Sequence, residues 1–213
     1  MIIFIYKKNM ITTFSEYQNE SKKTAMYSRE NGIGIMYIAL GLAGEHGEII
    51  EKIKQFIESK GEVFDNFKLE LTKEIGDLMW YISQLCTETG LELSKVASQI
   101  LKNEVDILDK YDEQIQNTQF NSIDIKLEYI CIDMTITISK LVEKIKKIIR
   151  NKNGNFDIED IDIINKILAT VFSNIRELIV LFSLSIKDIL NLNIQKITSR
   201  LNRGVIKSEG DNR

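Results

Sequence analysis

The chain contains no proline in its 213 residues. Proline breaks or kinks helices, because it lacks an amide hydrogen and its ring clashes with the preceding turn. A proline-free chain rich in leucine, lysine and glutamate, with few alternating β-branched runs, favours long helices. Isoleucine is the one abundant residue type that prefers strands instead. We therefore predict an all-α fold, built as a helical bundle.

Six segments show helical patterns separated by glycine-bearing or polar loops. We expect helices at 13–27, 35–59, 67–89, 92–112, 157–182 and 185–202, preceded by an arm at 1–12. In the fourth helix, Val96, Ile100 and Leu108 should face inward. The polar stretch before residue 123 predicts a linker. We expect a first unit at 1–115, a linker at 116–122 and a second unit at 123–213.

Charge and cysteine content narrow the function classes. The net charge of −3 provides no broad basic field, so we expect no nucleic-acid partner. Cys86 and Cys131 lack metal-type spacing and lie in apolar runs, which predicts buried free thiols of an intracellular protein. The apolar start, Met1 to Tyr6, is too short for a signal peptide. We also expect no segment of transmembrane length, hence no membrane partner and a cytoplasmic location.

Two expected helices each carry a pair of acids three residues apart, Glu45 with Glu48 and Glu74 with Asp77. Residues three apart share a helix face, so antiparallel packing would bring four carboxylates together. Such a group is unfavourable unless a cation lies within it. Oxygen ligands suit Mg²⁺, with Mn²⁺ as an alternative, and substrate phosphates commonly complete the Mg²⁺ shell. Taken singly, either pair is an ordinary feature of a solvated helix face.

Glycines accompany these acids: Gly41, Gly44 and Gly47 around the first pair and Gly76 beside Asp77. Each costs a helix about 1 kcal/mol relative to alanine. A solvated face gains nothing from that cost, whereas close approach of a backbone or a ligand requires it.

The only histidine, His46, directly follows Glu45 instead of lying three residues from an acid. The Glu-x-x-His pairs of di-iron bundles are therefore absent. We expect His46 to be exposed or to lie behind the ligands. No serine or cysteine has a plausible partner base, so a nucleophilic triad is not supported.

Three segments resemble one family. They are Leu40-Gly-Leu-Ala-Gly-Glu-His-Gly-Glu-Ile-Ile-Glu51, Glu74-Ile-Gly-Asp-Leu-Met-Trp-Tyr81, and the C-terminal Asn193-Ile-Gln-Lys-Ile-Thr-Ser-Arg-Leu-Asn-Arg-Gly204 with Gly210-Asp-Asn-Arg213. The first two resemble the MazG-like branch of the all-α nucleoside triphosphate pyrophosphohydrolases, and the third resembles the ending of its phage-type members. That family's pattern is E-x-x-E, a gap and E-x-x-D. Ser208 departs from the tail pattern, where phage-type relatives tend to have glycine.

The resemblance implies Mg²⁺-dependent hydrolysis of a nucleoside triphosphate, with a dNTP as the expected substrate, to the monophosphate and pyrophosphate. Its purpose would be nucleotide-pool control, in a protein that a virus could encode. Glu45, Glu48, Glu74 and Asp77 would bind metal, with Glu45 or Glu48 orienting the attacking water. The implied substrate-binding residues are Lys54, Trp80, Asn193, Lys196, Arg200, Arg203 and Arg213. The preferred base stays open, and the alternative function is a catalytically silent nucleotide-binding or protein-interaction module.

The second half of the chain echoes the first. Glu51-Lys-Ile-Lys54 recurs as Glu143-Lys-Ile-Lys146 at an offset of 92, which grows to 93 further on. This layout predicts a tandem duplication that forms a pseudo-dimer, with a homodimer left open. The second copy has lost the acids, which are replaced by Thr137, Lys140, Ile167 and Thr170. The first copy lacks the basic ending, since Ile100, Asn103 and Ile107 match Asn193, Lys196 and Arg200. We therefore predict one composite site, with acids from one copy and basic residues from the other.

Overall fold

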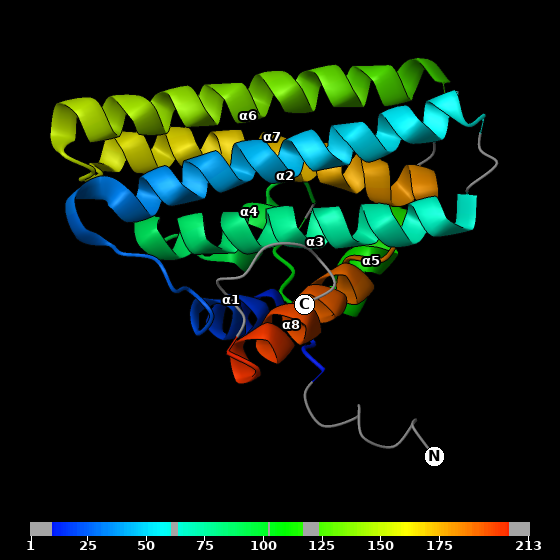
Figure 1. The fold of residues 1–213 in the computed structure, drawn as a ribbon, viewed down its shortest axis with the longest axis horizontal. Coiled ribbons are helices and arrows are strands. Elements are labelled where there is room, and N and C mark those ends of the chain that lie inside the picture. The colour runs from blue at the N-terminus through cyan, green and yellow to red at the C-terminus, as the bar shows by residue number, and fades with distance from the viewer. Residues whose placement is uncertain (1–9, 61–63, 102, 117–123, 205–213) are drawn as a thin grey trace.

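The computed structural model describes residues 10–60, 64–101, 103–116 and 124–204. Across these residues the prediction of an all-α fold is confirmed, and the only β-type pairing is an isolated bridge between Thr13 and Ile107. The described elements are α1 (Phe14–Lys22), the 3₁₀ helix η2 (Glu30–Gly32), α2 (Ile33–Glu58), α3 (Phe64–Thr89), α4 (Leu93–Ser98), α5 (Leu108–Gln116), α6 (Asp124–Lys152), α7 (Ile158–Phe182) and α8 (Ile186–Asn202) (Figure 1).

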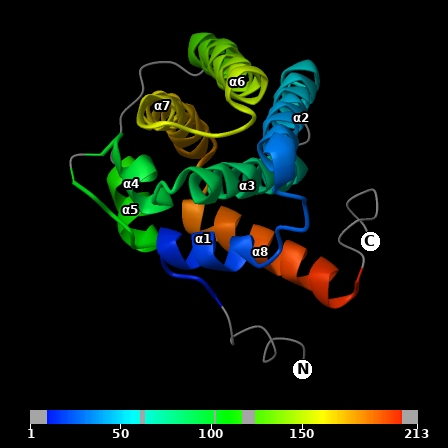
Figure 2. The same cartoon turned by 90° about the vertical axis from the view of Figure 1, so that its left-hand side faces the viewer.

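Four long helices form two hairpins, α2 with α3 and α6 with α7 (Figure 1). The hairpins pack together chiefly through α2 and α6, with further contacts between α3 and α7. Viewed from its end, the molecule has α6, α7 and α2 on one side of α3, and α1 and α8 on the other (Figure 2). As a result, α3 has neighbours on both sides, and its buried residues form one core with those of the other helices.

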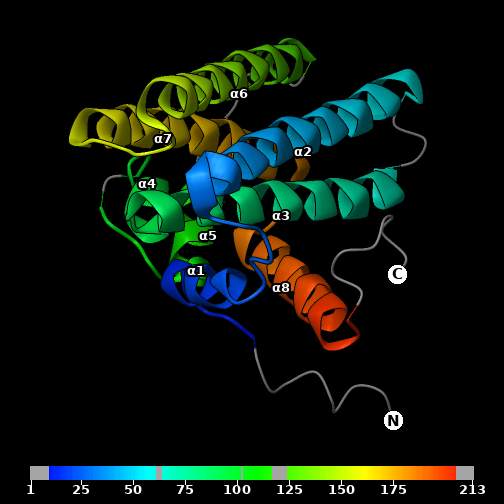
Figure 3. The ribbon, with the colours of Figure 1, turned by 60° about the vertical axis from the view of Figure 1, so that its left-hand side comes forward.

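The last described helix leaves the direction of α7 sharply. Between α7 and α8 the chain bends by 105°. The residue at the bend, Ser183, has a left-handed backbone with φ of 52°, and Ser185 caps α8 by accepting a hydrogen bond from the Asp188 amide. The bend carries α8 across α3, where it lies beside α1 (Figure 3).

The single helix predicted at 92–112 is wrong, because the chain forms α4 and α5 with an irregular segment between them. Ser98 binds the backbone of Val105 as both donor and acceptor, at 3.2 and 2.8 Å. The segment that follows pairs with the start of α1: the Phe14 amide donates to the Asp106 carbonyl, and the Leu108 amide donates to the Thr12 carbonyl. These tertiary bonds replace helical ones. Val96 and Leu108 are nevertheless buried as predicted, while Ile100 is only half-buried.

Other expectations fare unevenly. Cys86 is a buried free thiol, whereas Cys131 is only half-buried.

The predicted first helix at 13–27 ends early, at Lys22. Residues 117–122 of the predicted linker and residues 1–9 of the predicted arm at 1–12 lie outside the described residues. The segment Glu30–Glu58 does meet the length and apolarity of a membrane span, contrary to the expectation that none would, although α2 packs against α3 and α6.

Candidate metal centre

Three of the four predicted acids meet where α2 and α3 pack as a hairpin. Glu45 and Glu48 from α2 and Glu74 from α3 each offer a carboxylate oxygen, and these oxygens lie within 4.8 Å of one another. Glu74 is buried, Glu45 is half-buried and Glu48 is exposed. The i,i+3 spacing thus places acids from both helices on facing surfaces, as predicted.

The electrostatics of this group favour a bound cation. Burial raises the pKa of Glu45 to about 8, reinforced by the negative charges of Asp77, Glu48 and Glu74, while Lys196 opposes the shift. A carboxyl group with this pKa holds a proton at neutral pH unless a cation stabilises its charged form. The three donors are all carboxylate oxygens, which is the ligand type of Mg²⁺ and Mn²⁺. The residues present therefore fit a hard divalent cation.

A lysine of α2, Lys52, lies beside Glu74 and was not among the predicted site residues. Its Nζ atom is 3.7 Å from Glu70 Oε2 and 4.0 Å from Glu74 Oε1. Lys54 is exposed, and its Nζ atom is 3.7 Å from Glu58 Oε1. The structure thus does not bring Lys54 to the acid group. The spacing could have indicated Lys52, because it lies four residues after Glu48 on the same helix face.

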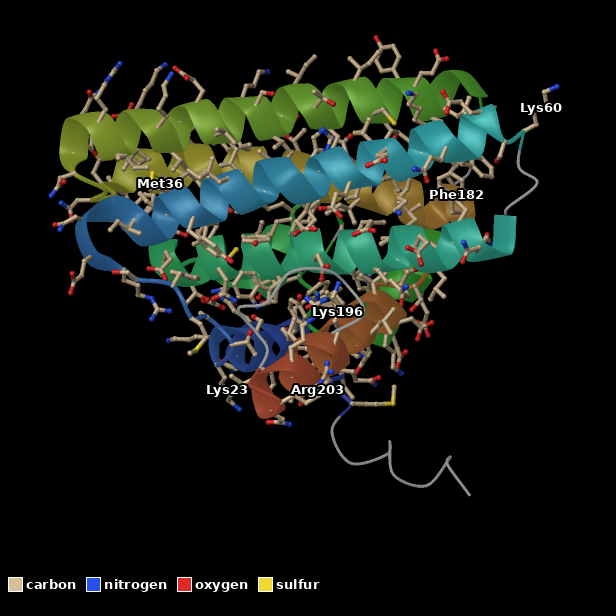
Figure 4. The ribbon with its side chains drawn as sticks, viewed as in Figure 1. Lys23, Met36, Lys60, Phe182, Lys196 and Arg203 are labelled. Atoms are coloured by element: carbon tan, nitrogen blue, oxygen red, sulfur yellow. The ribbon has the colours of Figure 1, made fainter. Side chains whose placement is uncertain are left out.

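The fourth acid, Asp77, is held by α8. Asn193 Nδ2 donates to Asp77 Oδ1 at 2.8 Å, and Lys196 Nζ donates to Asp77 Oδ2. Figure 4 shows Lys196 on the α3 side of α8. Gly76 permits this contact, since a Cβ atom there would lie 3.0 Å from Asn193 Cβ and 3.3 Å from the Ile189 carbonyl oxygen. The acids of the first half and the basic helix of the second half therefore meet, which is the geometry that the predicted composite site requires.

A cavity of about 480 Å³ opens beside Glu45 and Asp77. Its lining combines charged, aromatic and other side chains from α2, α3, α8 and the segment before η2: Thr24, Met26, Tyr27, Tyr37, Glu45, Asp77, Trp80, Tyr81, Ile197 and Arg200. Trp80 and Arg200 were predicted as substrate-binding residues, and both line it. Tyr27 and Tyr37 were not predicted, because no local pattern distinguishes them from core or surface tyrosines.

The aromatic end of the cavity is fixed by contacts among its own side chains. Trp80 Nε1 donates to Thr24 Oγ1 at 2.8 Å, and the rings of Tyr27 and Tyr37 stack with centroids 5.3 Å apart. Tyr81 lies against Gly41, where a Cβ atom would come within 2.1 Å of its ring. Gly41 therefore makes room for an aromatic ring of the cavity wall.

Two of the glycines do not serve such a contact. Beyond the neighbouring backbone of α2 itself, no described atom lies within 4 Å of the Cβ positions of Gly44 or Gly47, so only Gly41 and Gly76 of these four glycines match the predicted close approach.

The remaining predicted residues divide by position. Asn193 is buried, whereas Arg203 is exposed at the end of α8, where its Nε donates to the Ser199 carbonyl at 3.3 Å (Figure 4). Arg213 lies outside the described residues. His46 is buried, with Nε2 2.9 Å from Thr135 Oγ1 of α6, so an exposed position was the wrong expectation. Burial lowers the pKa of His46.

A comparison with protein families matches the half of the chain that carries the acids. A family profile described as the MazG nucleotide pyrophosphohydrolase domain matches residues 36–104, which include all four acids. The "Gene 37 protein" of Mycobacterium phage L5 is 34% identical over 90 residues, covering 40% of this chain and 79% of the phage protein. No solved structure matches. The profile ends before α8 and therefore does not include Lys196, whose contact with Asp77 is seen in the structure.

Proposed function

Since the chain belongs to the MazG nucleotide pyrophosphohydrolase family, we propose that it hydrolyses a nucleoside triphosphate to the monophosphate and pyrophosphate with Mg²⁺. The observation that carries the proposal is the group of carboxylate oxygens from Glu45, Glu48 and Glu74, all within 4.8 Å of one another. A cavity with aromatic and basic walls opens beside it, and Glu45 also lines that cavity. A polyphosphate and its base can thus be held side by side.

The carboxylates have distinct roles in this proposal. Glu45, Glu48 and Glu74, together with Asp77, would hold Mg²⁺ or Mn²⁺, which when bound polarises phosphate oxygens and lowers the pKa of a bound water. Glu48 is exposed, so water reaches it directly, and we assign it to orient the attacking water and accept its proton. Buried Glu74 has its Oε1 atom 4.0 Å from Lys52 Nζ, so the positive charge of Lys52 lies beside the acid group.

Basic side chains from α8 would bind the phosphates. Arg200 and Asp77 both line the cavity, and the Arg200 guanidinium can bind two phosphate oxygens at once. Lys196 is in contact with Asp77 and lies one helical turn before Arg200. Both would neutralise the charge that develops on the departing pyrophosphate.

The aromatic end of the cavity would receive the base. Several of its hydrogen-bonding groups are engaged within the protein: Trp80 with Thr24, Tyr27 with Glu88, and Tyr81 with Tyr37. Stacking instead of edge recognition would therefore hold the base. Apolar pockets discriminate between similar ligands by only about 10–200-fold, so we expect several bases to be accepted.

We further propose that the chain arose by duplication and holds one site as an internal pseudo-dimer. The acids come from the first half and Lys196 and Arg200 come from the second, so neither half holds a complete site. Its task would be control of nucleotide pools, in the cytoplasm and, given the phage relative, as a virus-encoded protein.

Release of pyrophosphate from canonical and modified NTPs and dNTPs, measured with and without Mg²⁺, tests the proposal. At least one dNTP should be cleaved. Glu48→Gln and Asp77→Asn should each abolish cleavage while far-ultraviolet circular dichroism stays unchanged. Lys54→Ala serves as a charge control, because Lys54 lies away from the acids. Nucleotide binding without turnover in the presence of either metal would instead favour the silent binding module.

A further inference from the structure

A chain of buried polar contacts connects Asp77 to the N-terminal helix. The Tyr17 hydroxyl of α1 donates to Asn193 Oδ1 at 2.8 Å, and Asn193 Nδ2 of α8 donates to Asp77 Oδ1 at 2.8 Å. Tyr17 is 0% exposed and Asn193 is 3% exposed. Three helices thus meet through one continuous hydrogen-bonded path that ends at an acid of the proposed site.

The chemistry of the three groups fixes the direction of this path. An ionised carboxylate only accepts hydrogen bonds, so Asn193 must present its NH₂ group to Asp77. The amide oxygen of Asn193 then faces Tyr17, whose hydroxyl must donate. Burial, and then the charge of Asp77, hold the pKa of Tyr17 well above its usual range, so the hydroxyl keeps its proton. Without this donor, the buried amide oxygen of Asn193 loses its hydrogen-bond partner, and the amide is held in place by one contact fewer.

We infer that Tyr17 and Asn193 are positioning residues, which orient the Asp77 carboxylate toward the metal-binding acids Glu45, Glu48 and Glu74. This inference rests on the proposed function. Asn193 does not bind substrate in this assignment, because its amide oxygen and its NH₂ group are both engaged inside the protein. Lys196 binds the other oxygen of Asp77 from the α3 side of α8, and its side chain is long enough to turn toward a phosphate. Asn193, being short and buried, stays with Asp77.

The packing of α8 shows that Asn193 is held in this place. Gly76 lets Asn193 approach α3, since a Cβ at position 76 would lie 3.0 Å from Asn193 Cβ. Two residues earlier on α8, Asn191 binds the backbone of Ile11 in both directions, at 2.9 and 3.1 Å. Asn191 therefore fastens the N-terminal segment to α8 without touching the acids, which makes it a matched control for Asn193.

The test measures binding of Mn²⁺ alone by electron paramagnetic resonance, which needs no turnover. Tyr17→Phe keeps the ring and removes only the donor. We expect it to weaken Mn²⁺ binding about tenfold, the usual scale for losing a group that orients a ligand. Asn193→Ala should weaken binding at least as much. Because Tyr17 acts through Asn193, adding Tyr17→Phe to Asn193→Ala should cause no further loss.

Two controls separate positioning from stability. Tyr111→Phe removes a hydroxyl from another buried tyrosine, in α5, and Asn191→Ala loosens α8 from the N-terminal segment. Both should leave Mn²⁺ affinity unchanged, whatever their effect on the melting temperature. A Tyr17→Phe protein that binds Mn²⁺ like the wild type, or a double variant with the full sum of both losses, would overturn the inference and leave the proposed function standing. Wild-type protein that neither binds Mn²⁺ nor releases pyrophosphate would overturn both.

Discussion

The hairpins α2–α3 and α6–α7 have the same core but different outer faces. Buried positions of α2 recur in α6 at an offset of 92, as in the pairs Ile35 and Leu127, Ile38 and Ile130, Leu42 and Met134, His46 and Ile138, Ile49 and Leu141, and Ile53 and Ile145. Buried positions of α3 recur in α7 at an offset of 93, as in Leu71 and Ile164, Ile75 and Leu168, Met79 and Phe172, Leu85 and Leu178, and Cys86 and Ile179. Matching burial at these offsets supports the duplication that we propose.

The connections of the two hairpins match as well. Lys60 and Asn153 follow the first helices with φ of 52° and 51°, and Gly90 and Ser183 follow the second helices with φ of 74° and 52°. Both pairs are separated by 93 residues. Left-handed residues close helix ends by letting the chain reverse its course. The two halves therefore turn in the same way at the same places.

The helices that follow the hairpins differ. Six-residue α4 follows α3 and packs on α7, whereas seventeen-residue α8 follows α7 and packs on α3. Each hairpin is thus covered by the helix that follows the other one. Of these two helices, only α8 is long, and it carries Lys196 and Arg200 to the hairpin that has the acids. Where acids would stand in the second hairpin, it has Thr137, Lys140, Ile167 and Thr170. The two hairpins thus share a core pattern, but only the α2–α3 hairpin carries the acids of the site that we propose.

Removing the charge at matched positions of the two hairpins should give the largest difference, which we expect in the rate of pyrophosphate release. Glu48→Gln should lower the rate of pyrophosphate release by about a thousandfold or more, because it removes a charge from the acid group. Lys140→Gln, at the corresponding position of α6, should leave the rate unchanged. Steady-state kinetics on both variants measures the difference. Equal losses would show that the two hairpins are not functionally distinct.

Metal should stabilise the first hairpin. Mg²⁺ at a hundred times its Kd should add about 2.7 kcal/mol to the free energy of unfolding, or about 5–10 °C in Tm for a chain of this size. The gain should vanish in Glu45→Gln/Glu74→Gln. It should persist in Thr137→Ala/Ile167→Ala, the corresponding change in the second hairpin. Thermal scans with and without Mg²⁺ test this, and no gain in the wild type would argue against a preformed site.

The same site predicts an unusual pH dependence without metal. Folding raises the pKa of Glu45 from 4.5 to about 8, so the folded protein binds a proton more tightly than the unfolded chain. The resulting stabilisation is complete below pH 4.5 and is lost as the pH rises through about 8. Metal-free wild type should therefore lose stability relative to Glu45→Gln over this interval. Denaturation midpoints at a series of pH values, in the presence of a chelator, measure the difference, which Mg²⁺ should abolish.

Loss of one basic side chain from α8 should have a smaller effect. Arg200→Ala should weaken nucleotide binding about 10–100-fold, the scale of one charge-assisted hydrogen bond. Asn103→Ala, at the position that corresponds to Lys196, should change nothing. Mixing Glu48→Gln chains with Arg200→Ala chains should restore no activity, because both residues belong to one site within one chain. Restored activity would show instead that the halves are exchanged between chains.

Glycine substitutions should give the smallest effect, with opposite signs. Gly44→Ala should stabilise the protein by up to about 1 kcal/mol, because no described atom stands near its Cβ position and alanine favours a helix. Gly76→Ala should destabilise it by pushing α8 from α3, although the matching residue of α7 is Ala169. Urea midpoints measure both. Equal gains would mean that α8 does not press on α3.

The sequence by itself determined most of the helices and the acid pairs. Helix formation and the sharing of a face at three- and four-residue spacing depend on interactions within a few turns, so composition and spacing report them directly. The composite site was also predicted from the way the two halves differ, and the contact of Lys196 with Asp77 is the geometry it requires.

The tertiary structure decided which faces meet. It broke the segment after Ser98 through bonds to residues near Thr12, placed Lys52 instead of Lys54 beside Glu74, and buried His46 against α6. It also gathered the tyrosines of the cavity and turned Asn193 inward to Asp77. Each of these outcomes depends on surfaces that come from distant parts of the chain. Their contacts follow from the packing of whole helices, which no local pattern encodes.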